Sequence, residues 1–344
     1  MRKRSWLFVA GASLATLSLA VGSALADPTS PSGPRDLAGV GSDTTQGVMN
    51  ALADVITIGG TKVVASYDAT GANPITTKGA TGSAPCTFNR PVGSGAGVDK
   101  LNNSVNVAHD GCVQFARSSN NDSGARTGQN LTYIPFAKDS ITYAVNTTGN
   151  VSRALTKSFL QQLYTCTLSP TVLANFHPYL PQPNSGTRKF FMETYLGVAN
   201  PEPPASCISD KDPTDPSGNT LLVENTGNKL NSDPKAVVPY SISSYIGQVN
   251  KAKFVTDVHG QFVLGSISTT ANTADAVSPV LLNTNSGAVR DVYNVVPTGQ
   301  IGAGTETNQV FVGSGSLVCQ NTTTITAQGF APHPQCGDTS IQTP

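Results

Sequence analysis

The chain has 344 residues, of which 21 are Lys or Arg and 21 are Asp or Glu, so its formal net charge is zero, and only 12% of its residues are charged. Such a composition provides no basic stripe for nucleic acid and no basic amphipathic helix for a membrane surface, which argues against both partners. A chain of this length can bury a substantial core and is long enough for two domains.

The first 26 residues have the pattern of a secretory signal peptide. Basic residues at 2–4 precede an apolar run over 6–21, and Ala24-Leu25-Ala26 supplies a small-x-small cleavage site. A membrane anchor would need a longer apolar run and a stop-transfer flank, and no cysteine lies near the cleavage site for a lipid anchor. We therefore expect residues 1–26 to be removed after Ala26, which leaves an exported, extracellular or cell-surface protein of net charge −3.

The elements of the next hundred residues alternate between strands and helices. Residues 27–36 are rich in Pro, Ser and Gly and predict a short disordered spacer. A strand over 37–41, a polar turn over 42–45 and apolar residues at helical spacing over 48–56 then follow, and 62–67 predicts the next strand. This order of strand, turn and helix is typical of the opening of an α/β fold.

The rest of the chain continues this alternation. Predicted strands or extended segments lie at 113–116, 132–146 (a strand pair with Pro135 at its edge), 177–183, 236–240 and 292–296, with β-rich excursions over 255–290. Predicted helices follow 98 and 184–187 and cover 151–163, 243–250 and 322–330. Strands alternating with helices predict an α/β architecture.

The six cysteines indicate disulfides, because an even number in an exported chain is typical of them. Several connectivities are possible, and we prefer the sequential one because each bridge then closes a local loop. The expected pairs are Cys86–Cys112, Cys166–Cys207 and Cys319–Cys336. A metal site is not indicated, since no Cys-x-x-Cys spacing occurs and the four histidines are scattered.

Three turns rich in Gly, Ser and Thr each join a predicted strand to a predicted helix, at 41–45, 93–97 and 184–188, and a fourth strand ends at 117–119. Helix N-termini expose unpaired N–H groups and the positive end of the helix dipole, which favours anions. The candidate anion-binding residues are Ser42, Asp43, Thr44, Thr45, Ser94, Gly95, Arg117, Ser118, Ser119, Ser185, Gly186, Thr187 and Arg188. A single such turn is more often a plain helix cap, so the prediction depends on the four segments converging.

In combination these motifs resemble the periplasmic-type phosphate-binding proteins of ABC phosphate importers, in an actinobacterial-looking branch with a Gly-Ser-Asp-Thr-Thr opening. Residues 39–44 match the family's first anion-contacting turn, 92–98 its Gly-Ser-Ser-Gly-Gly turn and 184–187 its Ser-Gly-Thr turn, while 134–146 is similar to its interlobe strand. The resemblance implies a type II periplasmic-binding-protein fold, whose two α/β lobes close on the anion, with phosphate as the expected ligand and a membrane permease as partner. It implies no catalysis and no cofactor.

The same resemblance implies the domain organisation. Lobe one is expected to comprise residues 37–135 plus 292–344, and lobe two residues 136–291. We expect the protein to be a monomer.

Two positions depart from the family pattern. Where the family has an aspartate at the end of a Phe-Gly-Ala-Ser-Asp strand, this chain has Ser119, and the family's binding arginine would fall near Pro181. Arg117 and Arg188 are the candidate replacements for the positive charge. Asp43 is the candidate hydrogen-bond acceptor for a protonated anion, although capping its own helix is an equally good interpretation of that residue.

Two other classes of function stay open at this point. A secreted hydrolase has the necessary Ser, His and Asp, but the serine of Gly93-Ser94-Gly95-Ala96-Gly97 is in the wrong place for a Gly-x-Ser-x-Gly nucleophile elbow. The second alternative is an extracellular or cell-surface protein that has the fold but serves no importer. The lack of a lipid anchor favours this alternative, because a soluble binder outside a single membrane would diffuse away.

Overall fold

The structure is a computed structural model that describes residues 27, 35–80, 83–267 and 282–344. The expected signal peptide and most of the expected spacer lie outside these residues, as does the segment 268–281 of the expected β-rich excursions. Within the described residues, no helix is both long enough and apolar enough to cross a membrane.

A mixed sheet of nine strands forms the centre of the molecule, in the order β10-β11-β8-β14-β7-β1-β4, with β12 and β15 also paired to β8. The strands of this sheet are β1 (Leu37–Gly41), β4 (Val64–Ser66), β7 (Phe115–Ser118), β8 (Leu131–Asn146), β10 (His177–Pro178), β11 (Ala236–Ser241), β12 (Phe262–Leu264), β14 (Val289–Pro297) and β15 (Ala331–Pro332). β1 runs parallel to β4 and β7, whereas β14 is antiparallel to β7 and β8. The expected α/β fold class is therefore confirmed.

Shorter elements surround the sheet. Three small pairs of strands are β2 (Thr57–Ile58) with β3 (Thr61–Lys62), β5 (Ile75–Thr77) with β6 (Cys86–Phe88), and β9 (Ala154–Leu155) with β13 (Ser266–Ile267). The α-helices are α1 (Gln46–Val55), α2 (Ser94–Asn102), α3 (Lys157–Tyr164), α4 (Pro170–Leu173), α5 (Gly186–Lys189), α6 (Ile242–Val249), α8 (Glu306–Phe311), α9 (Leu317–Gln320) and α10 (Thr322–Ala327). Two π-helices, η1 (Asn103–Val107) and η3 (Phe190–Leu196), and the 3-10 turns η2 (Ser123–Ala125), η4 (Gly227–Leu230) and η5 (Thr298–Gln300) are the remaining elements of the described residues.

Helices cover both faces of the sheet, because successive strand residues point to opposite sides. On β7, Phe115 packs in a cluster with residues of α1, α8, α9 and α10, while the next residue, Ala116, packs with residues of α2. Helices also pack against both faces of the second half of β8. There, Tyr143 packs with residues of α3 and η3, and Ala144 with residues of α6.

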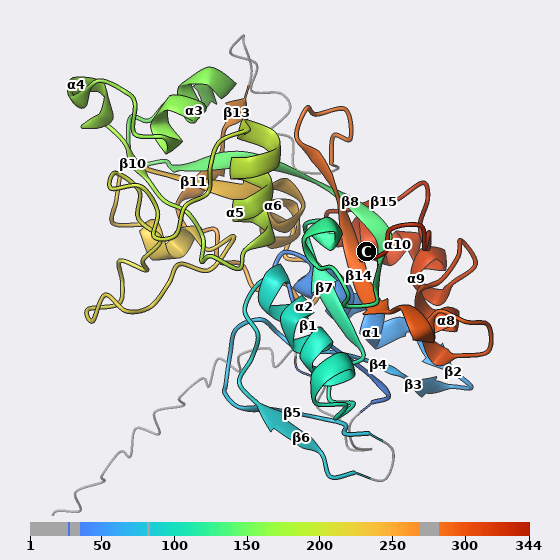
Figure 1. The fold of residues 1–344 in the computed structure, drawn as a ribbon. Coiled ribbons are helices and arrows are strands. Elements are labelled where there is room, and N and C mark those ends of the chain that lie inside the picture. The colour runs from blue at the N-terminus through green and yellow to red at the C-terminus, as the bar shows by residue number, and fades with distance from the viewer. Residues whose placement is uncertain (1–26, 28–34, 81–82, 268–281) are drawn as a thin grey trace, which may run out of the picture.

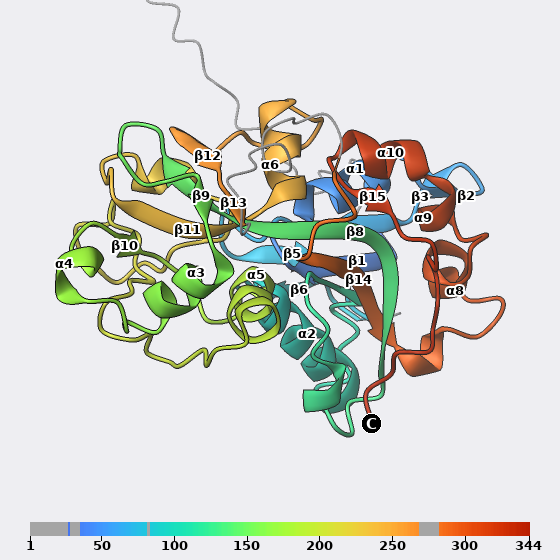
Figure 2. The same cartoon turned by 90° about the horizontal axis from the view of Figure 1, so that it is seen from above.

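Strand β8 runs through both halves of the molecule (Figures 1 and 2). Its first part pairs with β14 and β15, and its last part pairs with β11 and β12. The hydrophobic core residues of β8 up to Ala137 belong to the clusters with α1 and α2, and those from Ile141 onward belong to the clusters with α3 and α6. The switch from one pair of clusters to the other, between Ala137 and Ile141, lies close to the expected lobe boundary at 135/136. The lobe ranges themselves stay a prediction.

Two secondary-structure predictions need correction. Residues 131–146 form one long strand rather than a strand pair, because Pro135 is accommodated at a shift of register between Val292 and Tyr293 of β14, where a residue without an N–H disrupts no regular ladder. The helix expected over 151–163 begins only at Lys157. Its first residues form β9 instead, and the hydroxyl of Thr156 caps the helix by accepting a hydrogen bond from the N–H of Phe159.

Candidate anion-binding site

The turn after β1 lies against the end of β7 and the start of α2. Gly41 has a φ of +120°, and a Cβ at this position would lie 2.7 Å from the carbonyl oxygen of Arg117. A Cβ on Gly97 would lie 2.5 Å from the Cα of Gly41. Only glycine permits this approach, so the first two glycine-rich turns and the fourth strand end meet as the prediction required.

The third turn joins the same group. The N–H of Gly95 donates to the carbonyl of Asn184 over 3.1 Å, and a Cβ on Gly186 would lie 2.5 Å from the hydroxyl oxygens of both Ser94 and Ser119. Those two hydroxyls lie 3.2 Å apart, and the N–H of Ser119 donates to Ser94 Oγ over 3.0 Å. All four segments therefore converge, although they come from distant parts of the sequence.

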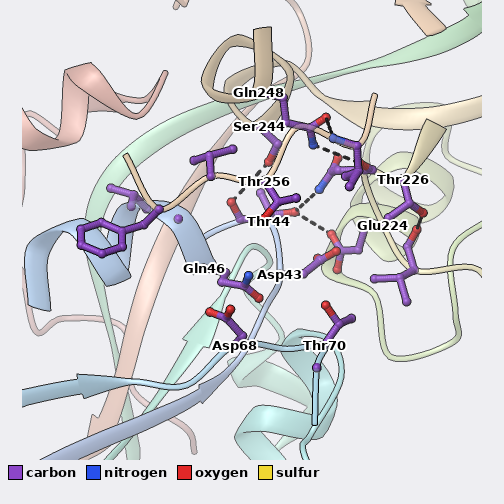
Figure 3. A pocket seen from close by; sticks show the side chains of 18 of the residues that line it. Asp43, Thr44, Gln46, Asp68, Thr70, Glu224, Thr226, Ser244, Gln248 and Thr256 are labelled. Atoms are coloured by element: carbon purple, nitrogen blue, oxygen red, sulfur yellow. Dashed lines mark hydrogen bonds between the residues drawn. The ribbon is translucent and has the colours of Figure 1, made fainter. Parts of the chain in front are cut away.

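Hydroxyl groups of the first and third turns meet at one carboxylate that the sequence analysis did not identify. Thr44 Oγ1 and Thr187 Oγ1 lie 3.2 Å apart, and both donate to Glu224 Oε2, over 2.6 Å and 2.5 Å. Asn225 Nδ2 donates to Thr44 Oγ1 over 3.1 Å. Figure 3 shows Thr44 and Glu224 of this group on the wall of a pocket. The four side chains are buried, so the loop at 224–225 connects the two turns.

Arg290 on β14 supplies a buried cation beside these turns. Its Nε and Nη2 donate to Asp139 Oδ2 on β8 over 3.0 Å and 2.8 Å, and Nη2 also donates to Thr187 Oγ1 over 2.9 Å. Asp139 is held in turn through Oδ1 by the hydroxyl of Ser241 and the N–H of Ser243. Within the described part of the chain, the Nη1 group of Arg290 is buried without a hydrogen-bond partner. One charge-assisted donor is thus available for a ligand.

The two arginines expected from the sequence are engaged elsewhere. Arg117 is fully buried and donates to the carbonyls of Gly39 and Ser42. These hydrogen bonds fix the backbone of the first turn. Arg188 binds the carbonyls of Pro181 and Pro201. Both guanidinium groups therefore stabilise the backbone around the turns, whereas Arg290 has an unpaired donor beside them.

Two of the expected serines also have local partners. Ser118 Oγ donates to the carbonyl of Asn120, and Ser185 Oγ accepts from the N–H of Arg188, which is an ordinary N-cap. By contrast, the hydroxyls of Ser42 and Thr45 and the Oδ1 atom of Asp43 are buried without a partner among the described residues. These three atoms of the first turn are free to bind a ligand.

The N-cap residue of α1 is Thr45 rather than Asp43, and the helix has no side-chain cap bond. The carboxyl group of Asp43 lies beside that of Glu224 (Figure 3). Burial, and then the neighbouring Glu224 carboxylate, raise the pKa of Asp43 well above its ordinary value. Asp43 therefore keeps its proton to a higher pH than an ordinary aspartate does, so it is a titratable group within the site.

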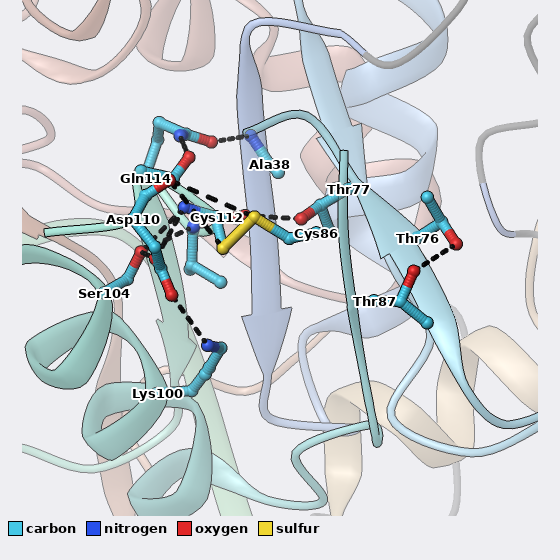
Figure 4. Close-up of a disulfide and its surroundings, with 12 residues drawn as sticks. Ala38, Thr76, Thr77, Cys86, Thr87, Lys100, Ser104, Asp110, Cys112 and Gln114 are labelled. Carbon is cyan, nitrogen blue, oxygen red and sulfur yellow. Dashed lines mark hydrogen bonds and ion pairs between the residues drawn. A yellow bond between two sulfur atoms is a disulfide. The ribbon is translucent and has the colours of Figure 1, made fainter. Parts of the chain in front are cut away.

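The disulfide prediction is confirmed, with the pairs Cys86–Cys112, Cys166–Cys207 and Cys319–Cys336. The carbonyl of Asp110 lies near both sulfurs of the first pair, whose surroundings Figure 4 shows. These three residues are the only group of metal-ligand type among the described residues, and their sulfurs are bonded to each other, so they are not available to a metal.

A family model decides the relationship of the chain to known proteins. Residues 28–299, which are most of the sequence, match the family described as PBP superfamily domain. The chain belongs to this family. The expected class of solute-binding protein is thereby confirmed at the level of the PBP superfamily, and the hydrolase alternative is not favoured. No curated protein matches the sequence.

Solved structures agree with this membership. An ABC-type phosphate transport receptor from Vibrio cholerae has a TM-score of 0.52 at 16% identity, over 86% of this chain and 99% of the receptor. A putative phosphate ABC transporter substrate-binding protein with bound phosphate, from Clostridium perfringens, has a TM-score of 0.53 at 15% identity, over 86% and 99%. Identities this low show the fold alone, which is the expected type II periplasmic-binding-protein fold.

Proposed function

We propose that the chain is an exported solute-binding protein that captures a tetrahedral oxyanion, phosphate first, for an ABC importer. The observation that carries the proposal is the convergence of three helix starts beside the buried Arg290, whose Nη1 has no partner among the described residues. The positive ends of the helices and a buried guanidinium favour an anion. The two solved structures described above are named as phosphate receptors, which supports the same ligand.

The donors proposed for the anion come from both halves of the molecule. Ser42 and the N-terminus of α1 would contact it from one side, and Thr187 and the N–H groups at the start of α5 from the other. α5 continues directly into η3, so this helical stretch covers 186–196. In this proposal the hydroxyl groups of Thr44 and Thr187 donate to the anion instead of to Glu224. Because the anion contacts both lobes, it stabilises the closed state.

The hinge of this closure would be the pair of strands β8 and β14. Asp139 and Arg290 lie opposite one another on these strands and connect to Ser241 and Thr187 on the other side of the site. In this proposal the lobes are residues 37–135 plus 292–344 and residues 136–291, as expected from the sequence. The mature protein is a monomer that begins at Asp27 and meets its importer as the closed, loaded form.

Phosphate should stabilise the mature protein against heat. A ligand at 100 times its dissociation constant adds about 2.7 kcal/mol to the free energy of unfolding, so millimolar phosphate should raise the melting temperature by several degrees if the affinity is micromolar. Scanning calorimetry suits the measurement, because the only tryptophan lies in the expected signal peptide. No shift with phosphate, sulfate, arsenate or molybdate would contradict the proposal and favour a protein that has the fold without the binding function.

A further inference from the structure

A cavity of about 500 Å³ adjoins the converged turns. Its walls come from the start of α1 and from the loops at 68–72, 223–226 and 254–258 (Figure 3). Asp43, Thr44 and Glu224 belong both to this cavity and to the proposed anion site. The volume is typical of sites for organic molecules, which range from roughly 300 to 1,000 Å³. An inorganic phosphate held by the turns would leave the cavity almost empty.

The charges that line the cavity are mostly negative. The carboxyl groups of Asp43, Asp68 and Glu224 lie on its wall, and among the described lining residues the other charged groups are Asp27 and Arg90. These two form an ion pair with each other, and Arg90 also donates to the carbonyl of Asp68. The positive charge of Arg90 is thus already paired. The buried Arg117 offsets part of the charge of Asp43 and Asp68 from the other side of the first turn, but none of the three carboxyl groups on the cavity wall forms an ion pair among the described residues.

Three buried atoms of the lining residues lack a hydrogen-bond partner among the described residues, and all three are acceptors. They are Asp43 Oδ1, Glu224 Oε1 and Gln328 Oε1. Glu224 is 1% and Gln328 is 4% exposed. The Nε2 group of Gln328 donates to the carbonyl of Lys253, which fixes the orientation of the amide with its oxygen unpaired. The group missing from this cavity is therefore a hydrogen-bond donor.

The titration of the two aspartates agrees with a missing cation. Burial and the carboxylate of Glu224 raise the pKa of Asp43, and burial raises the pKa of Asp68. A cation placed between these groups would lower both values again and release protons. The carboxylates do not gather closely enough for a metal ion, since no group of three among the described residues includes them. An organic ammonium group with several N–H donors suits their wider spacing.

We propose that this cavity holds the ammonium-bearing end of a phosphate monoester or phosphonate whose oxyanion lies in the converged turns. The inference rests on the proposed function and narrows its ligand to a zwitterion. The ammonium group would donate to Glu224 Oε1 and Asp43 Oδ1, and Asp68 would add a further negative charge. Gln328 Oε1 would accept from a remaining donor of the ligand.

Calorimetric titration of the mature chain at pH 7.5 tests this inference. The probes are O-phosphoethanolamine, glycerol 3-phosphate, which has hydroxyl groups but no cation, and inorganic phosphate. We expect O-phosphoethanolamine to bind at least about ten-fold tighter than either of the others, which corresponds to one well-placed charged hydrogen bond. Titrations in buffers of different ionisation enthalpy should also show more proton release for O-phosphoethanolamine than for glycerol 3-phosphate.

Two variants test whether the preference for the aminated ligand arises in this cavity. Asp68→Asn retains the acceptor for Asn50 Nδ2 and should reduce the preference for the aminated ligand several-fold, while the affinity for inorganic phosphate stays the same. Asp54→Asn is the matched control, because Asp54 pairs with Lys62 and Lys253 at the surface, outside the cavity. It should leave both affinities unchanged.

The outcomes separate this inference from the proposed function. If phosphate binds and O-phosphoethanolamine binds no tighter than glycerol 3-phosphate, the inference is overturned and the proposed function stands. If none of the three probes binds, both are overturned. An amine preference that survives unchanged in Asp68→Asn would also overturn the assignment to this cavity.

Discussion

Replacing Arg290 with methionine is expected to lower the free energy of unfolding by about 3–5 kcal/mol, because it leaves Asp139 as an uncompensated buried charge. The side chains of Arg290 and Asp139 are 2% and 0% exposed, so water cannot replace the lost partner. The same change removes the proposed cationic donor of the anion site, and phosphate affinity should fall by about 10- to 100-fold or more. Denaturant unfolding followed by circular dichroism, together with calorimetric titration, measures both effects.

The double variant Arg290→Met, Asp139→Asn separates stability from binding. The amide that replaces the carboxylate would keep an oxygen for the hydroxyl of Ser241 and the N–H of Ser243 but would carry no charge. We expect the double variant to regain most of the lost stability while phosphate binding stays weak. If Arg290→Met binds phosphate as tightly as the wild type, Arg290 is not part of the anion site.

Asp43→Asn is expected to change the choice of anion. At neutral pH phosphate retains a proton that sulfate lacks. Burial raises the pKa of Asp43 in the empty site, but once Asp43 gives up its proton as the anion binds, its carboxylate can accept a hydrogen bond from phosphate, whereas it repels sulfate. A site built around such a bond can reject the analogue by a factor of roughly 10⁴–10⁵. The asparagine variant should therefore bind phosphate more weakly and sulfate more tightly. Titration of both anions into both proteins is the measurement, and equal wild-type affinities would end this role for Asp43.

The raised pKa of Asp43 adds a dependence on pH that the same variant should remove. Below the unfolded-state value of about 3.9, the carboxyl is protonated in both states and costs nothing. As the pH rises toward the higher folded-state value, the folded protein retains the proton and stability falls. Asp43→Asn should therefore gain more stability relative to the wild type at pH 8 than at pH 4. A constant difference between the two pH values would contradict the pKa direction.

The parts of the site that could be predicted are those with a local signature. The segments at 41–45, 93–97 and 184–187 combine glycine with hydroxyl residues just before a helix or in its first turn, since α2 begins at Ser94 and α5 at Gly186, and the structure brings them together. The sequential disulfides were also predictable, because each closes a short segment. In each of these cases the chemistry and the spacing occur within one stretch of the chain.

The sequence analysis did not identify four residues around the site, which are Arg290, Asp139, Glu224 and Asn225. They are far apart in the sequence and come close to the turns only in the folded protein. Arg290 contacts Asp139 across β8 and β14, 151 residues apart in sequence. One signal was present, since Arg290 and Asp291 are charged residues inside a mostly apolar strand, and a buried arginine needs a partner. Glu224 and Asn225 lie in a loop with no regular pattern, so no periodicity could have indicated them.

The proposal that the converged turns bind a tetrahedral oxyanion is tested most directly by a crystal structure of the mature protein grown in saturating phosphate. We expect tetrahedral density in contact with Arg290 Nη1, Ser42 and the N–H groups at the start of α5, with Thr44 and Thr187 bound to the anion instead of Glu224. Unbroken hydrogen bonds from Thr44 and Thr187 to Glu224, with no anion between the turns, would contradict the account.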